Sequence, residues 1–364
     1  MHTSVIGTPI ADLDTPALLV EIEALDANIA VIAGVLKQRG IGWRPHAKAH
    51  KSPAVAHRLL KAGAFGVTCA KLGEAEIYAG AGIVDILVAN QVVGPIKTRR
   101  LAALARSTDI MVAVDSLTNA RQINAAAEVA GSSPRVLIEI DSGMHRAGVA
   151  PGESAVELAK QVASLGHIRF AGVMGWEGHA VAIADPGRRS QEIRNAVGRL
   201  VSTAEQIRSA GIPIGIVSCG GTGTFLAASD LPGVTEIQAG GGIFGDAFYR
   251  MLDVPVQPGL SLLVTVTSRP TPTRIIVDAG RKSVDPSNIP PSVVGLDHVE
   301  AIGLSAEHGT ISLSRDAETP GVGDRLTLAI GYSDQAVHLH ERLFAIRDGH
   351  VEAVWPTLAR GKLQ

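Results

Sequence analysis

Short apolar runs alternate with amphipathic stretches over the first two thirds of the chain. Eight runs rich in Val, Ile, Leu and Ala predict buried β-strands, and the stretches between them carry the apolar stripe of helices, several ending in Gly. The expected strands cover residues 41–48, 64–71, 85–90, 110–116, 135–143, 170–179, 214–221 and 234–242. The expected helices cover residues 24–40, 52–63, 71–82, 97–107, 117–131, 154–166 and 192–211.

Regular alternation of strand and helix is typical of parallel strands joined by crossover helices. Eight strands are the number that a closed (β/α)8 TIM barrel requires, and the span from residue 41 to about 253 approaches the usual length of about 250 residues. We therefore predict an α/β fold whose N-terminal part is a (β/α)8 barrel.

The pattern changes after about Pro255. Segments rich in Val, Ile and Thr, divided by Gly, Pro and Asp, replace the helical stretches and predict an all-β domain. These segments cover residues 260–268, 273–280, 301–313, 325–332 and 343–356. Residues 15–22 predict a further strand that could pair with this sheet. We expect a barrel over residues 15–255 and a β domain over 256–364, to which residues 1–25 add a strand.

The composition narrows the class of protein. The chain is 46% hydrophobic and 19% charged with a formal net charge of −2, and it has no run of like charges. These features argue against a nucleic-acid partner. Neither a leader pattern nor a long uncharged apolar run occurs, so we expect a cytoplasmic protein with no membrane contact. Cys69 and Cys219 fit no zinc spacing, and we expect two buried thiols.

Cationic and titratable residues gather in one short segment, "RPHAKAHKSP" at residues 44–53, at the end of the first expected strand. Catalytic groups of barrels lie at the carboxyl ends of strands. Arg44, His46 and Lys48 share one parity and would point to one side of the strand. If that side is inward, neighbouring cations and partial burial would make Lys48 a nucleophile toward a carbonyl. The alternative is a solvated loop, above all for His50 and Lys51.

Two glycine runs follow the last two expected strands. They are "SCGGTGT" at residues 218–224 and "QAGGG" at 238–242, where barrels commonly bind phosphate through backbone N–H groups. Glycine also serves tight turns, so each run alone is a weak signal. A lysine at one strand end and a phosphate site across the barrel mouth together suggest pyridoxal phosphate, whose aldehyde forms a Schiff base with lysine.

The motifs "RPHAKAHK", "EIDSGMHRAGV", "SCGGTGT", "EIQAGGG", "DAGRKS" and "AEHG" occur in this order. These motifs resemble those of the D-threonine aldolase and D-serine dehydratase group, which belongs to the fold-type III, alanine-racemase-like pyridoxal phosphate enzymes. The resemblance extends from about Asp12 to Arg360. The resemblance implies the alanine racemase type of barrel and the cofactor on Lys48. It implies that Arg146 contacts the cofactor's phenolic oxygen and that His46 and Arg44 shape its surroundings. The implied phosphate residues are Gly221, Thr222, Gly240 and Gly241. Asp278, Lys282 and His308 also match family motifs, with either a structural or a catalytic role.

The chain departs from the family where a metal is expected. The resemblance implies a His-x-Asp or His-x-Cys pair that holds a divalent cation at the substrate's 3-hydroxyl. Here the segment reads "GYSDQAVHLHE", with Tyr332 in place of the histidine and Asp334 retained. One carboxylate rarely holds Mn²⁺ or Mg²⁺ unless other ligands converge. His338 or His340 could compensate, so a metal site at Asp334 is left open.

The end of the sixth expected strand departs as well. It reads "MGWEGHAVA", whereas the aldolases carry Tyr-His-Gly and a later histidine. Trp176 could stack at the substrate mouth, and Glu177 or His179 could take the 3-hydroxyl proton. Core or loop roles are an equal alternative for each. Either Glu177, His179 and Tyr332 rebuild the proton chemistry or the reaction differs.

The resemblance implies a lyase that acts on D-3-hydroxy amino acids and releases glycine and an aldehyde. Dehydration of the same substrates is the alternative, with Lys48 as the α-proton base. A racemase needs acid and base groups on both faces of the cofactor, and Tyr332 favours it. A cofactor carrier without activity would lack the C-terminal β domain. That domain commonly completes the partner's site in fold-type III enzymes, which implies a homodimer.

Overall fold

The computed structural model describes residues 5–364, which form two compact units. The barrel unit comprises residues 32–48, 56–240 and 361–364, and the β unit comprises 5–31, 49–55 and 241–360. The chain therefore passes between the units several times. This grouping attaches residues 241–255 to the β unit, and the boundary near residue 255 stays a prediction.

All eight predicted barrel strands are present and form one parallel sheet in the order β2-β9-β8-β7-β6-β5-β4-β3. The sheet curls until its ends meet, because an isolated parallel bridge joins His46, just beyond β2, to Thr68 in β3. The N–H of Thr68 donates to the carbonyl of Pro45 at 2.9 Å across this seam. The strands are β2 (Gly42–Trp43), β3 (Val67–Cys69), β4 (Asp85–Gln91), β5 (Asp109–Val114), β6 (Arg135–Ile140), β7 (Arg169–Gly175), β8 (Ile216–Cys219) and β9 (Glu236–Ile237).

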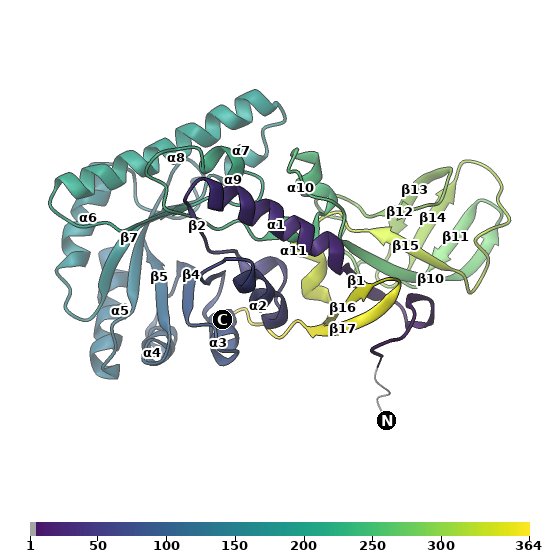
Figure 1. Cartoon of the computed structure of the whole chain (residues 1–364), viewed down its shortest axis with the longest axis horizontal. Coiled ribbons are helices and arrows are strands. Elements are labelled where there is room, and N and C mark those ends of the chain that lie inside the picture. Colours follow the sequence, from purple (N-terminus) through teal and green to yellow (C-terminus); the bar gives the residue numbers. More distant parts are fainter. Residues whose placement is uncertain (1–4) are drawn as a thin grey trace. The chain divides into compact units, whose positions relative to one another are not determined.

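The predicted helix α1 precedes the first barrel strand, and the other predicted helices follow their strands along the outside of the barrel (Figure 1). Helix ends match local chemistry, since the Ser116 side chain accepts from the N–H of Asn119 and left-handed Gly131 ends the same helix. One helix begins six residues earlier than predicted, because Asp185 caps it and Pro186 occupies its first turn. The helices are α1 (Ile22–Gln38), α2 (Pro53–Lys61), α3 (Leu72–Gly80), α4 (Pro95–Leu104), α5 (Leu117–Ala130), α6 (Glu153–Ala163), α7 (Gly178–Val181), α8 (Pro186–Ser209) and α9 (Phe225–Ala228).

Apolar side chains from successive barrel strands form a buried cluster. Its members come from β4, β5, β6 and β7 and are Leu87, Met111, Ala113, Leu137 and Met174. A filled interior leaves the strand ends as the places where polar side chains can gather. The two cysteines, Cys69 and Cys219, end their strands as buried thiols that form no disulfide, as predicted.

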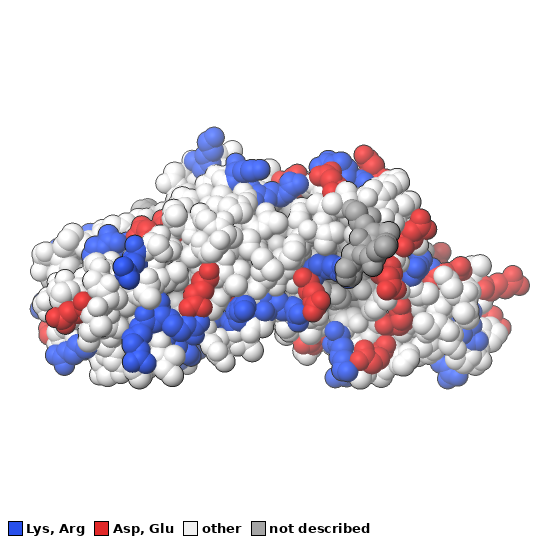
Figure 2. All heavy atoms as spheres, turned by 90° about the horizontal axis from the view of Figure 1, so that it is seen from below, with Lys and Arg blue, Asp and Glu red and all other residues white. Residues whose placement is uncertain are grey.

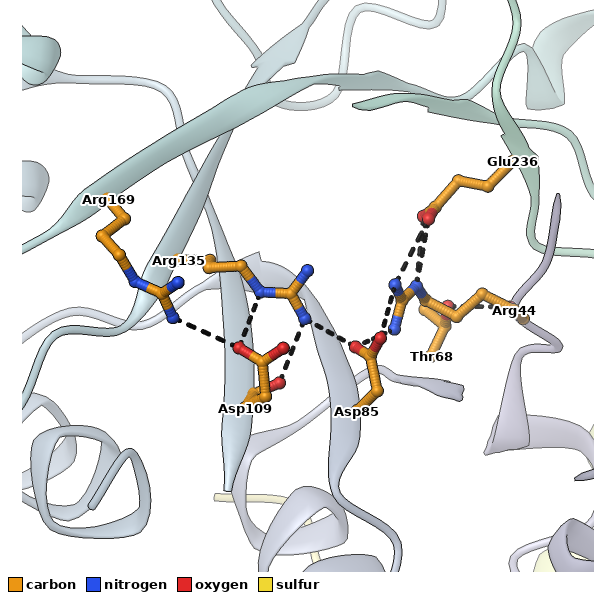
Figure 3. A network of polar contacts seen from close by, with 7 residues as sticks. All are labelled: Arg44, Thr68, Asp85, Asp109, Arg135, Arg169 and Glu236. Atoms are coloured by element: carbon orange, nitrogen blue, oxygen red, sulfur yellow. Dashed lines mark hydrogen bonds and ion pairs between the residues drawn. The ribbon is translucent and has the colours of Figure 1, made fainter. Parts of the chain in front are cut away.

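A chain of ion pairs closes the end of the barrel where the strands begin (Figure 3). Arg44 is paired with Asp85, the first residue of β4, and with Glu236, the first residue of β9. Arg135 joins Asp85, at 2.6 Å, to Asp109, at 2.9 Å. Alternating charges on neighbouring strand starts neutralise one another, so this end of the barrel is tied together electrostatically.

The β unit is a nine-stranded, mostly antiparallel sheet built largely after the barrel. The predicted N-terminal strand, β1 (Ala17–Glu21), belongs to it and pairs antiparallel with β10 and parallel with β16. Short strand β12 (Ser292–Val294) was not predicted. The remaining strands are β10 (Leu260–Thr271), β11 (Arg274–Val277), β13 (Val299–Leu304), β14 (Gly309–Leu313), β15 (Arg325–Ala329), β16 (Arg342–Arg347) and β17 (His350–Pro356), with short helices α10 (Ala247–Met251) and α11 (Ser333–Ala336).

The surface carries both charge signs. On the face in Figure 2, Lys and Arg side chains and Asp and Glu side chains lie among uncharged residues. Within residues 5–364, no helix has the length and apolar character needed to cross a bilayer.

Candidate functional site

Lys48 lies on a 3-10 turn, Ala47–Ala49, just beyond the carboxyl end of β2. The strand itself ends at Trp43, so the side-chain alternation expected through Lys48 stops where the backbone begins to coil. Lys48 is half-buried, and its backbone N–H donates to Nδ1 of His46 at 3.3 Å. Nδ1 of His46 is therefore an acceptor, which places the proton of a neutral imidazole on Nε2.

The Arg44 side chain extends to the other end of the barrel, where the strands begin. It is 1% exposed, and its guanidinium reaches the acids at the strand starts and lies 4.4 Å from the ring centroid of Phe65. Burial lowers the pKa of Arg44, but Glu236 and Asp85 outweigh it and leave the pKa raised. Arg44 thus ties the strand starts together. Its predicted role around the cofactor stays a prediction that this geometry does not favour.

The glycine run after β9 lies against the lysine segment. The N–H of His46 donates to the carbonyl of Gln238 at 2.9 Å. A β-carbon on Gly240 would be 2.3 Å from the carbonyl oxygen of His46. Only glycine allows this approach, so the first and last strands bring the two predicted motifs together at the barrel mouth.

The glycine run after β8 is held from the β7 side. The N–H of Gly221 donates to Oγ1 of Thr224 at 2.9 Å, and that hydroxyl donates to Oε1 of Glu177 at 2.5 Å. A β-carbon on Gly221 would be 2.5 Å from the indole of Trp176. Glu177, Thr224 and Thr222 are all buried. Trp176 and Glu177 therefore fix the shape of this run, and Thr224 is a residue that the sequence did not single out.

Asp141 organises the loop that carries Arg146. Its Oδ1 accepts from the N–H groups of Gly143 at 3.0 Å and His145 at 2.9 Å. The Arg146 side chain is 57% exposed, with a guanidinium nitrogen 3.9 Å from Oε1 of Glu139. This arrangement leaves the guanidinium accessible to a ligand.

Glu139 and Gln91 are two polar residues at the ends of β6 and β4 that the sequence did not single out. Nε2 of Gln91 donates to Oε2 of Glu139 at 2.5 Å. Glu139 is buried, and burial raises its pKa. The signal was present, because Glu139 stands two residues after inward-facing Leu137 in a strand that is apolar from Val136 to Ile138.

His179 lies in α7 and is held by α8. Its Nε2 is 3.0 Å from Oε1 of Glu192, and that oxygen also accepts from Arg199 at 3.0 Å. Arg199 in turn donates to the carbonyl of Ser142. Nδ1 of His179 is buried and has no hydrogen-bond partner among the described residues. If the ring proton lies on Nε2, facing Glu192, Nδ1 is the acceptor nitrogen, the role that a general base needs.

The predicted residues of the β unit form a separate cluster. Tyr249 donates a hydrogen bond to the phenol oxygen of Tyr332, which donates to Asp334. Their ring centroids are 6.0 Å apart. A β-carbon on Gly241 would be 2.6 Å from the Tyr249 hydroxyl. Burial raises the pKa values of both tyrosines, so Tyr332 and Tyr249 are neutral phenols.

Asp246 holds this cluster in place through hydrogen bonds to Ser333 and Tyr249. It accepts from the N–H of Ser333 at 2.7 Å, from the Ser333 hydroxyl at 2.6 Å and from the N–H of Tyr249 at 3.1 Å. Burial raises the pKa of Asp246 to about 6. These contacts tie the segment around Tyr332 to the start of α10.

The barrel unit fits pyridoxal phosphate. Glycine at 221 and 240 keeps the backbone flush against Trp176 and His46, where any β-carbon would clash. Lys48 offers an amine for the aldehyde, Arg146 a cation for the phenolate, and the glycine runs offer backbone donors for the phosphate.

A divalent cation does not fit in the same way. Asp334 accepts from Tyr332, and a neutral phenol is a poor ligand for Mn²⁺ or Mg²⁺. His340 is engaged elsewhere, with Nε2 2.7 Å from the carbonyl of Ser283. Across residues 5–364, no three His, Cys, Asp or Glu side chains converge as metal ligands.

Comparisons with known proteins find relatives over nearly the whole chain. A D-threonine aldolase from Arthrobacter sp is 37% identical over 98% of this chain and 95% of its own length. A 3-hydroxy-D-aspartate aldolase from Paracoccus denitrificans (strain Pd 1222) is 33% identical over 98% of this chain and 94% of its own length.

Solved structures extend the likeness to the fold. A crystal structure of D-threonine aldolase from Filomicrobium marinum matches with a TM-score of 0.94 at 34% identity, covering 99% of both chains. A cysteine-to-alanine variant of D-threo-3-hydroxyaspartate dehydratase, in the metal-free form, matches with a TM-score of 0.87 at 28% identity, over 96% of this chain and 99% of the other.

Family comparisons assign both parts of the chain. Residues 20–247 match the family described as alanine racemase, N-terminal domain, and residues 259–346 match the putative serine dehydratase domain. The first match alone spans more than half of the sequence. The chain therefore belongs to the alanine racemase N-terminal domain family, in the branch that carries a serine dehydratase domain behind the barrel.

Proposed function

We propose that the chain is a pyridoxal-phosphate-dependent lyase that cleaves D-3-hydroxy amino acids into glycine and an aldehyde. The observation that carries this proposal is the similarity to D-threonine and 3-hydroxy-D-aspartate aldolases over 98% of the chain. The placement of Lys48 beside a glycine run at the barrel mouth supports it.

The candidate site residues of the barrel unit have defined roles in this proposal. When bound, the cofactor supplies the electron sink that accepts the electron pair of the broken Cα–Cβ bond. Lys48 binds its aldehyde carbon, and Arg146 compensates its phenolate charge. His179 takes the 3-hydroxyl proton at Nδ1, and Glu192 stabilises the resulting imidazolium through Nε2–H.

Dehydration is the second candidate function. The match of residues 259–346 to the putative serine dehydratase domain and the structural likeness to a D-threo-3-hydroxyaspartate dehydratase favour it. In that reaction the hydroxyl leaves Cβ instead of the Cα–Cβ bond breaking. A racemase is a weaker candidate, because the Tyr332 hydroxyl is already donated to Asp334.

Product analysis separates these reactions. The pyridoxal-phosphate-loaded protein is incubated with D-threonine, D-phenylserine, D-3-hydroxyaspartate and D-serine, with L-threonine as the stereochemical control. Glycine from the D-3-hydroxy substrates is the expected product. A 2-oxo acid without glycine would establish the dehydratase instead, and the opposite enantiomer with deuterium at Cα would establish a racemase.

Attachment of the cofactor is tested separately. Borohydride reduction followed by peptide mass spectrometry should place the cofactor mass on Lys48. Lys51, three residues further on, is the matched control: Lys51→Ala should keep the label, and Lys48→Ala should lose it. A label on another lysine would contradict the proposed attachment.

The protein is also proposed to be a homodimer. Size-exclusion chromatography with light scattering should give twice the mass of one chain. A monomer of full activity would contradict the expectation that a partner completes the site.

A further inference from the structure

Glu177 is a buried acid at the barrel mouth whose surroundings do not suit a proton acceptor. It follows β7 directly and is 1% exposed. Its carboxylate accepts a hydrogen bond from the Thr224 hydroxyl at 2.5 Å and another from the N–H of Gly220. A general base needs a lone pair within reach of the substrate proton. The lone pairs of Glu177 are directed into the protein.

Thr224 extends the contact through the glycine run. Its hydroxyl donates to Glu177 and accepts from the N–H of Gly221 at 2.9 Å, and its own side chain is buried. One carboxylate thus fixes two consecutive backbone amides, those of Gly220 and Gly221. Gly220 has a positive φ of 76°, a conformation that glycine adopts without a steric penalty.

The indole of Trp176 adds a steric constraint to the same run. A β-carbon on Gly221 would be 2.5 Å from this ring, so only glycine fits there. Trp176 and Glu177 are adjacent in the sequence. The turn after β7 therefore holds the run after β8 by one close steric contact and one hydrogen-bonded chain. Both contacts lie within the barrel unit.

We propose that Glu177 is a positioning residue that holds residues 220–224 in the shape that receives the cofactor's phosphate. This inference rests on the proposed function, because that function requires the cofactor. It removes Glu177 from the candidates for the catalytic base and leaves His179. Burial raises the pKa of Glu177, and the hydrogen bonds that its carboxylate accepts oppose this rise.

The experiment compares two ligands that differ only in the phosphate. Apo-protein is titrated with pyridoxal phosphate and with pyridoxal, and the ratio of the two dissociation constants measures the contribution of the phosphate site. Thr224→Val removes the relay hydroxyl at nearly constant volume. Glu177→Gln replaces the carboxylate by an amide of the same shape. The matched control is Glu157→Gln, an exposed acid on α6.

Thr224→Val and Glu177→Gln are expected to weaken pyridoxal phosphate binding by about tenfold, the effect of losing a hydrogen bond to a charged group. Pyridoxal binding should stay unchanged, and Glu157→Gln should bind both ligands like the wild type. Thr224→Ser keeps the hydroxyl and should restore the ratio. Near-ultraviolet circular dichroism of each apo-protein shows that the fold is intact.

Two results would overturn the inference. One is an unchanged ratio together with a fall in kcat, which would make Glu177 a catalytic base. The other is a wild-type protein that binds both ligands equally, which would refute the phosphate site itself. A wild-type protein that prefers pyridoxal phosphate but forms no glycine would refute only the lyase proposal.

Discussion

Arg44 and Glu236 form an ion pair that is almost fully withdrawn from water, with Nε 3.2 Å from Oε1 and side chains 1% and 4% exposed. They lie 192 positions apart in the sequence and join the first barrel strand to the last. Removing one partner of a buried pair costs about 3–5 kcal/mol when the other charge is left uncompensated, and because Asp85 still faces Arg44 the low end of this range applies. We predict that Glu236→Gln lowers the free energy of unfolding by about 3 kcal/mol in urea denaturation.

The same network provides the control. Arg169 pairs with Asp109 at 3.3 Å with both side chains about half exposed. Exposed ion pairs contribute about 0–1 kcal/mol, so Arg169→Ala should change the unfolding free energy by less than about 1 kcal/mol. Equal effects of the two variants would show that burial does not set the strength of this network.

His50 makes the fold sensitive to acid. Burial, aided by the charge of Lys51, lowers the pKa of His50 from 6.5 to about 3, and its Nδ1 accepts from the N–H of Ser52. Below pH 6.5 the unfolded chain protonates this histidine while the folded protein keeps it neutral. Stability is therefore present above pH 6.5 and is lost as the pH falls, by about 2 kcal/mol between pH 6.5 and 4.5.

His50→Asn tests this pH dependence. The asparagine oxygen can accept from the N–H of Ser52, as Nδ1 does in the native turn. Urea denaturation at pH 7 and at pH 4.5 should show a smaller loss of stability for the variant than for the wild type. Identical losses would mean that other groups control the acid response. His50 is thus no part of a solvated loop, which was one of the alternatives from the sequence.

Most of the fold could be predicted from the local pattern of apolar and polar residues, because the strands and helices of a barrel alternate over short stretches of sequence. All eight barrel strands and the N-terminal strand β1 were predicted. The three-residue strand β12 was missed because it pairs with β15 through only a few residues and carries no apolar alternation of its own. The sequence could not specify how the barrel closes, because the His46–Thr68 bridge lies outside any regular strand.

Only part of the candidate site could be predicted from the sequence. Lys48 and the glycine runs stand out by type and position. Glu139 and Gln91 escaped notice because their hydrogen bond joins residues 48 positions apart. Parity could not place the guanidinium of Arg44, since alternation says which side of a strand a residue faces but not which end of the barrel a long side chain reaches.

Gly240 is predicted to be irreplaceable for a steric reason. A β-carbon there would lie 2.3 Å and 2.5 Å from backbone atoms of His46, which cannot move aside as a flexible side chain could. We expect Gly240→Ala to destabilise the protein by about 1–3 kcal/mol and to weaken cofactor binding. Gly34, inside α1 with open space around it, is the control, and Gly34→Ala should stabilise the helix by about 0.5–1 kcal/mol. Thermal unfolding measures both, and an unaffected Gly240→Ala would contradict the observed packing.

Tyr332 is predicted to make the reaction independent of a divalent cation. Its half-buried side chain donates a hydrogen bond to Asp334, and a neutral phenol does not supply the ligand that a histidine would. Glycine formation by the wild type should therefore be unchanged by chelator, and Mn²⁺ titration followed by electron paramagnetic resonance should detect no bound ion. Tyr332→His creates a His-x-Asp pair and should bind one Mn²⁺, which Asp334→Asn in the same chain should abolish. A wild-type protein that binds Mn²⁺ and stops in chelator would show that ligands other than this pair complete a metal site.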